Sequence, residues 1–92
     1  MKLIDVVNEI DSIDQDAVIF QKDLKDATSD VLISFVEEGD EGVKQTAGIQ
    51  YYYLIEVALA KEFIDDFKNS LNNDVTSQQV ASRLNKYAIN DA

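Results

Sequence analysis

The spacing of apolar residues changes twice along this 92-residue chain, and that change constrains the fold more than any other feature of the sequence. In residues 3–10, apolar side chains recur at the i, i+3, i+4 and i+7 positions of an amphipathic helix. The middle of the chain is instead rich in β-branched and aromatic residues, which favour strands, and the helical spacing returns from Ala58. The sequence therefore predicts an α+β fold.

Two strands are predicted in the first half of the chain. Residues 17–22 and 30–37 combine β-branched and aromatic side chains, and Val31, Ile33 and Phe35 share one face of the second strand. All three glycines of the chain fall within residues 38–48, where we expect a loop.

Residues 49–57 are the ambiguous segment. As part of a helix continuing to Leu71, they would place the carboxylate of Glu56 within the apolar stripe, and burial of an unpaired carboxylate is costly. A strand removes this conflict, although no turn residue separates Val57 from the helix that follows. We favour the strand, because a third strand also stabilises what would otherwise be an isolated hairpin.

The tyrosines of this strand predict how its two faces are used. Alternation sends Tyr51 and Tyr53 into the core, while Tyr52 and Leu54 point to the opposite face. Leu32 of the preceding strand would share that second face, so both faces of the sheet would be apolar. One face must then be covered by the N-terminal helix, by a second copy of the chain or by a partner.

Two helices complete the prediction. An Asn-Asn-Asp sequence after Leu71 ends the first of them. The second begins with a capping box, in which Thr76 and Gln79 satisfy each other's backbone N–H groups, and Val75 and Val80 form the accompanying hydrophobic staple. The expected order is α-β-β-β-α-α, with a small antiparallel sheet of three strands (two if residues 49–57 were helical), in a single domain spanning residues 1–92.

Charge and composition argue against several classes of function. The chain carries 18 acidic and 8 basic residues, a formal net charge of −10, so it lacks the clustered Lys and Arg with which nucleic-acid-binding proteins contact phosphates. Histidine and cysteine are absent, which removes imidazole bases, thiol nucleophiles, disulfides and the usual zinc and haem ligands. We therefore expect no catalytic residues and no cofactor.

Two acidic clusters contain the oxygen ligands that Ca²⁺ and Mg²⁺ prefer, one at Asp11, Asp14 and Asp16 and the other within residues 37–41. Neither cluster has the spacing of an EF-hand loop. We interpret both as solvated loop carboxylates, and no metal site is predicted.

No segment of the sequence predicts membrane insertion. The longest uninterrupted apolar run, residues 51–55, is far shorter than the roughly 20 residues that cross a bilayer. Asp5 and Glu9 interrupt the apolar core that a signal peptide would need, and the lack of cysteine fits a reducing compartment. We expect a cytoplasmic protein.

Three segments of the chain, at residues 1–6, 16–20 and 56–67, resemble a family of small, acidic bacterial proteins of unknown function. The similarity extends over about residues 1–67, and the motif that suggests it is the last segment, EVALAKEFIDDF. The chain departs from that family at Phe67, where tryptophan is expected, and at Asp23 and Leu24, where a Pro-Trp pair is expected. Some members of such groups look like immunity proteins encoded beside bacterial toxins, so the resemblance implies a role of that type.

The acidic residues concentrate in the first half of the chain. Residues 1–46 hold 12 acids and 4 bases, whereas residues 47–92 hold 6 and 4. This asymmetry favours electrostatic steering of a basic protein partner. We therefore predict a non-enzymatic protein-binding module, of the immunity or inhibitor type, that occludes a basic partner. The predicted contact residues are Asp23, Asp26, Glu37, Glu38, Asp40 and Glu41, with Tyr52 as the aromatic anchor.

A small homodimeric protein with a structural or regulatory role is the alternative hypothesis. The contact between copies would then be the open sheet face or the aromatic helix. The genes that flank this one would separate the two hypotheses, because a neighbouring toxin or basic nuclease would favour the immunity role.

Overall fold

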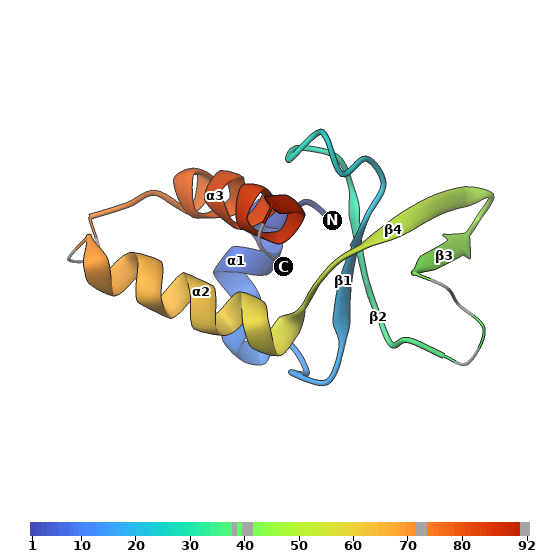
Figure 1. Cartoon of the computed structure of the whole chain (residues 1–92), viewed down its shortest axis with the longest axis horizontal. Coiled ribbons are helices and arrows are strands. Elements are labelled where there is room, and N and C mark those ends of the chain that lie inside the picture. The colour runs from blue at the N-terminus through green and yellow to red at the C-terminus, as the bar shows by residue number, and fades with distance from the viewer. Residues whose placement is uncertain (38, 40–41, 72–73, 91–92) are drawn as a thin grey trace.

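A computed structural model of the protein describes residues 1–37, 39, 42–71 and 74–90. In this part of the chain the elements are α1 (Leu3–Glu9), the 3₁₀ turn η1 (Ile10–Ser12), β1 (Val18–Gln21), β2 (Val31–Ser34), β3 (Val43–Thr46), β4 (Ile49–Glu56), α2 (Val57–Ser70) and α3 (Ser77–Asn90). The sheet is antiparallel with strand order β2-β1-β4-β3, and the helices lie together on one side of it (Figure 1). The predicted α+β class with an antiparallel sheet is confirmed.

The expectation of three strands is wrong, because β3 lies where the sequence predicted only a loop. Val43 is the sole strongly apolar residue of β3, so composition alone does not favour a strand there. The strand is held instead by its pairing with β4, in which Val43 lies opposite Tyr52 and Thr46 opposite Ile49. The order in the described residues is therefore α-β-β-β-β-α-α, with four strands.

The segment that was ambiguous in sequence is confirmed as a strand. β4 runs to Glu56, and α2 begins at the next residue, Val57. Glu56 still has extended backbone angles, and the Val57 N–H donates to the Ala17 carbonyl over 3.0 Å. This bond extends the pairing of β4 by one residue beyond β1, to Ala17. The first residue of α2 is therefore still held by the neighbouring chain, and the strand passes into the helix without a turn residue between them.

A bulge in β4 overturns the predicted orientation of the tyrosines. Ile55 lies opposite Ile19 and Tyr53 lies opposite Phe20, so Leu54 has no partner on β1. The extra residue lets Leu54 and Ile55 both enter the core beneath the helices, where they are 4% and 1% exposed. Beyond the bulge the alternation is reversed, so Tyr53 does not enter that core and is 39% exposed.

Tyr51 and Tyr52 follow the same reversal. Tyr52 pairs with Gln21, whose side chain reaches α3, so Tyr52 lies on the helix side of the sheet. Tyr51 pairs with Lys44 and lies on the other side. Tyr52 is nevertheless exposed, because the β3–β4 hairpin extends beyond the helices (Figure 1).

The main core lies between the helix side of the sheet and the three helices. Its fully buried members come from each layer and include Leu3, Val6, Ile19, Ile64, Val80 and Leu84. Phe20 is also fully buried, but it lies outside this cluster, and its ring makes an edge-to-face contact with Tyr53 at a centroid distance of 6.1 Å. The sheet thus has a second, smaller apolar cluster on the side away from the helices.

One buried hydrogen bond joins the sheet to the last helix. The side-chain amide of Asn85 on α3 donates to Gln21 Oε1 on β1 over 2.7 Å, and the two residues are 5% and 0% exposed. The Gln21 Nε2 atom donates in turn to the carbonyls of Ala27 and Ser29, and Asn85 Nδ2 also reaches the Leu24 carbonyl. This network therefore holds β1, α3 and the β1–β2 connection in one arrangement.

Replacement of Asn85 by leucine is expected to lower the free energy of unfolding by about 1–3 kcal/mol, because it leaves Gln21 Oε1 buried without a donor. The double variant Gln21→Met/Asn85→Leu removes both partners and should lose less than the sum of the single losses. Urea denaturation of the four proteins measures this coupling, and additive losses would show that the bond contributes no stability of its own.

Ala47, in the turn between β3 and β4, has a strained backbone conformation that a substitution can relieve. Ala47 has a φ angle of 51° and Gly48 one of 78°, as the two central residues of a type I′ hairpin turn require. A left-handed backbone costs an L-residue such as alanine about 1 kcal/mol, whereas asparagine and glycine tolerate it. Ala47→Asn is therefore expected to raise the free energy of unfolding by about 0.5–1 kcal/mol in urea denaturation. Thr46→Asn, one residue earlier, is the control that should give no such gain.

Candidate functional site

Two of the acidic residues predicted to contact a partner shape a loop instead. Asp23 and Asp26 lie in the β1–β2 connection and turn toward their own backbone. Asp23 Oδ1 accepts from the Lys25 N–H over 2.9 Å, and Asp26 Oδ1 accepts from both the backbone N–H and the hydroxyl of Thr28. The Thr28 hydroxyl and N–H together lower the pKa of Asp26. Both carboxylates are exposed, but their geometry is explained by the turn.

The other predicted contact residues do not gather around these two. Glu37 is exposed and follows β2, whereas Asp23 and Asp26 precede that strand, so they lie at opposite ends of it. Glu38, Asp40 and Glu41 lie outside the described residues. The predicted anchor, Tyr52, donates its hydroxyl to Gln50 Oε1 on the helix side of the hairpin.

A more continuous surface lies on the side of the sheet that faces away from the helices. The register places Val18, Phe20 and Leu32 on this side, together with Tyr53 and Glu56. Phe35 and Val36, directly after β2, border the same region and are 50% and 54% exposed. We call the set Val18, Leu32, Phe35, Val36, Tyr53 and Glu56 the outer sheet surface.

This surface combines apolar side chains with carboxylates around a shallow depression of about 360 Å³. Asp16 and Glu56 line it beside Val18, Phe35 and Tyr53. The Tyr53 hydroxyl donates to Glu56 Oε1 over 3.3 Å. Partial burial of the phenol, followed by the negative charge of Glu56 and this hydrogen bond, raises the pKa of Tyr53. The arrangement suits a ligand that brings both apolar groups and positive charge.

Sequence reasoning missed the part that Phe35 and Tyr53 play on this surface, because regular alternation assigned both residues to core-facing positions. Phe35 shares the odd-numbered pattern of Val31 and Ile33, which do contact the main core, but β2 ends before Phe35. The bulge at Leu54 places the side chain of Tyr53 on the face opposite to the one that regular alternation predicts. The available signal was the apolar character of both sheet faces, which indicates that the helices leave one face uncovered.

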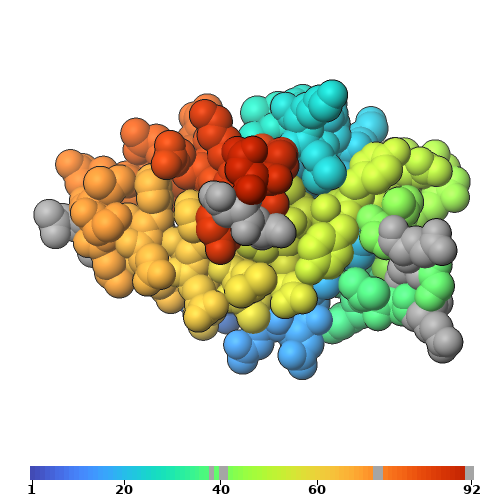
Figure 2. All heavy atoms as spheres, in the orientation of Figure 1, coloured from blue at the N-terminus to red at the C-terminus, as the bar shows by residue number. Residues whose placement is uncertain are grey.

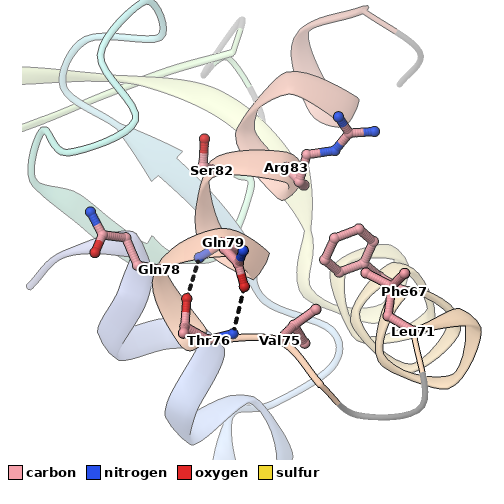
Figure 3. A pocket seen from close by; sticks show the side chains of 8 residues that line it. All are labelled: Phe67, Leu71, Val75, Thr76, Gln78, Gln79, Ser82 and Arg83. Atoms are coloured by element: carbon pink, nitrogen blue, oxygen red, sulfur yellow. Dashed lines mark hydrogen bonds between the residues drawn. The ribbon is translucent and has the colours of Figure 1, made fainter.

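A second concave surface lies between the end of α2 and the start of α3, where Figure 3 shows Phe67 and Leu71 facing Val75 across an open groove. The capping box at its base is confirmed. Gln79 N–H donates to Thr76 Oγ1 over 3.1 Å, and Thr76 N–H donates to Gln79 Oε1 over 2.9 Å. These bonds fix the first turn of α3, so the residues at the base of the groove are explained by helix capping.

One of the two helices around this groove, α3, carries a charge opposite to that of the chain as a whole. α3 has Arg83 and Lys86 and no acidic residue, although the net charge of the protein is −10. Phe63 of α2 stacks on Tyr87 of α3 with a centroid distance of 4.7 Å, and Phe67 stacks on Phe63 at 5.8 Å. Figure 2 shows the two helices packed side by side, at the opposite end of the molecule from the hairpin.

In the ranges given above, no three potential metal ligands come together. No helix of that part of the chain is long and apolar enough to cross a membrane.

The environment of Tyr53 predicts a measurable ionisation. Burial and Glu56 raise the pKa of Tyr53 in the folded state above the value of about 10 that it has in an unfolded chain. The contribution of Tyr53 ionisation to the free energy of unfolding is therefore fully present below pH 10, and it is lost as pH rises through the raised pKa. The difference in tyrosinate absorbance between the wild type and Tyr53→Phe should give a midpoint above 10. Glu56→Gln should lower that midpoint, and a midpoint insensitive to it would contradict the contact.

No protein family, curated protein or solved structure matches the chain. The resemblance of residues 1–67 to small acidic bacterial proteins therefore stays a prediction.

Proposed function

We propose that this chain is a non-enzymatic protein-binding module that occludes a basic partner, in the manner of an inhibitor or immunity protein. The outer sheet surface is the proposed contact. The observation that carries the proposal is the grouping of exposed apolar side chains beside two carboxylates on the sheet face that the helices leave open.

The apolar part of the surface can supply affinity. Phe35, Val36 and Tyr53 are 50%, 54% and 39% exposed, so a partner that covers them would remove a large apolar area from water. Aromatic residues near the centre of an interface commonly dominate its binding energy. Phe35 and Tyr53 therefore replace Tyr52 as the proposed anchors.

The carboxylates can supply charge complementarity. Asp16 and Glu56 line the same depression as Phe35 and Tyr53. Complementary fields of this kind accelerate association and discriminate against acidic partners. The proposed occlusion of a basic surface uses Asp16 and Glu56, without a contribution from Asp23 or Asp26.

A short fluorescein-labelled peptide of alternating lysine and valine provides the test, measured by fluorescence anisotropy. Phe35→Ser is expected to weaken binding by about tenfold, because it removes an exposed anchor without disturbing the main core. Ile89→Ser on α3 is the matched control, since Ile89 is 48% exposed and lies outside the surface. Glu56→Gln should also weaken binding, whereas Glu62→Gln on α2 should not.

The proposal also predicts how binding of the peptide depends on salt concentration and on the charge of the peptide. Binding should weaken as the salt concentration rises from about 0.05 M to about 0.5 M, and a peptide of alternating glutamate and valine should not bind. Equal binding of the two peptides, or equal effects of Phe35→Ser and Ile89→Ser, would contradict the proposal.

The homodimer is retained as the second candidate because Leu59 on α2, Leu71 directly after α2 and Ile89 on α3 are exposed, on the same helices that carry the stacked aromatic residues. Sedimentation equilibrium over a range of protein concentrations separates the candidates. A dimer that Ile89→Ser dissociates would favour it over the basic partner.

A further inference from the structure

We propose that the depression on the outer sheet surface receives one arginine side chain of the basic partner, with the guanidinium between Asp16 and Glu56. This inference rests on the proposed function and names the residue that the site recognises. General charge attraction would accept any basic residue, whereas this site is expected to prefer arginine over lysine at one position of the partner.

The sheet register brings the two carboxylates to one corner of the sheet. Val18 lies opposite Glu56. The Ala17 carbonyl accepts the Val57 N–H, so the pairing of the two chain segments extends one residue before β1. Asp16 comes next along the chain and lines the same depression as Glu56. Because diagonal neighbours across paired segments lie within reach of one long side chain, a single cation can contact both carboxylates.

Neither carboxylate is neutralised within the part of the chain that the structure describes. Asp16 donates its backbone N–H to Asp14, but its own carboxylate has no partner among these residues. Glu56 accepts the Tyr53 hydroxyl at Oε1, which leaves Oε2 without a described partner. The ion pairs between described residues lie elsewhere in the molecule. Two adjacent negative charges without a counter-charge favour a cation between them.

The aromatic rings beside the carboxylates favour a planar cation. Phe35 and Tyr53 line the depression, and both are exposed. A guanidinium is planar, is weakly hydrated and stacks on aromatic faces, whereas an ammonium is a compact and strongly hydrated charge. The N–H donors of a guanidinium also point in several directions, so it can bind both carboxylates at once. Arginine therefore matches the rings as well as the charge.

The size of the depression limits its occupant. Its volume of about 360 Å³ lies near the lower end of the range of roughly 300–1,000 Å³ that is typical of ligand pockets. This volume suits a side chain rather than a folded element of the partner. Val18 and Val36 line the depression beside Phe35, so the aliphatic stem of an arginine can lie against apolar groups.

The arginine of a second copy is the competing occupant. The chain contains one arginine, Arg83, which lies on α3. Its insertion into the depression of another copy would be a head-to-tail contact between two chains that each carry a net charge of −10. Because repulsion between such chains disfavours association, the proposal commits to an arginine of a different, basic protein.

Three fluorescein-labelled peptides test the preference. They alternate lysine with valine and differ only at the central cationic position, which is lysine, arginine or citrulline. In fluorescence anisotropy, the arginine peptide should bind at least about fivefold more tightly than the lysine peptide. Citrulline has nearly the shape of arginine without its charge, so the citrulline peptide should bind no more tightly than the lysine peptide.

Variants of the protein locate the preference in the depression. The measured quantity is the dissociation constant of the lysine peptide divided by that of the arginine peptide. Asp16→Asn and Glu56→Gln should each lower this ratio to below about two. Phe35→Leu keeps an apolar side chain but removes the ring, so it should lower the ratio as well. Glu62→Gln on α2 removes the same charge outside the depression and should leave the ratio unchanged.

The ionisation of Tyr53 provides a second measurement. Burial, and then the negative charge of Glu56, raise the pKa of Tyr53. An arginine beside Glu56 offsets that charge, whereas citrulline covers the ring without offsetting it. With unlabelled peptides, the midpoint of Tyr53 ionisation should therefore be lower in the arginine complex than in the citrulline complex. Equal midpoints would contradict the position of the guanidinium.

The outcomes separate this inference from the proposed function. Equal binding of the arginine and lysine peptides, with the salt dependence and the Phe35→Ser effect intact, would overturn the arginine site and leave the basic partner in place. Failure of all three peptides to bind would overturn both. An arginine preference that survives in Asp16→Asn and Glu56→Gln would also overturn the site. Self-association that Arg83→Gln abolishes in sedimentation equilibrium would instead identify a second copy as the source of the arginine.

Discussion

The hydrogen bond between Gln21 and Asn85 determines how the two layers of this protein meet. Neither amide can be buried without a partner at acceptable cost, so the bond fixes which face of β1 lies against α3. The remaining donors of this pair bind carbonyls of the β1–β2 connection, which sets where β2 begins. Apolar burial drives the helices onto the sheet, but this polar contact selects one arrangement among those that bury similar area.

The bulge at Leu54 then determines which side chains of β4 lie on the outer sheet surface. Without the extra residue, Tyr53 would lie on the same side as Ile55, which is buried beneath the helices. With it, Tyr53 contacts Phe20 on the opposite side and stands beside Glu56. One unpaired residue in β4 therefore produces a surface that combines an aromatic anchor with negative charge.

Much of the fold was predictable from the sequence. For the candidate site, the sequence indicated the kinds of side chain, acidic and apolar, but not which residues lie together. The helices, the strand at residues 49–56 and the capping box at Thr76 follow from local spacing, and the structure confirms them. β3 was missed because a polar strand is held by its neighbour rather than by its own composition. Among the predicted contact residues, Asp23 and Asp26 are engaged in turns, and Tyr52 lies on the helix side. The acidic charge led to the prediction of a basic partner, which stays a prediction, but it did not point to the side chains that line the outer sheet surface.

The sequence by itself determined the α+β class, the two helical periods of α2 and α3, and the absence of imidazole and thiol chemistry, since these depend on residue identity and local spacing. Only the tertiary structure decided that β3 exists, that β4 contains a bulge and that Phe35 and Tyr53 lie on the outer sheet surface. The physical reason is that strand register is set by pairing between residues far apart in the chain. A shift of one residue in that pairing exchanges the two faces of a strand without any change in sequence.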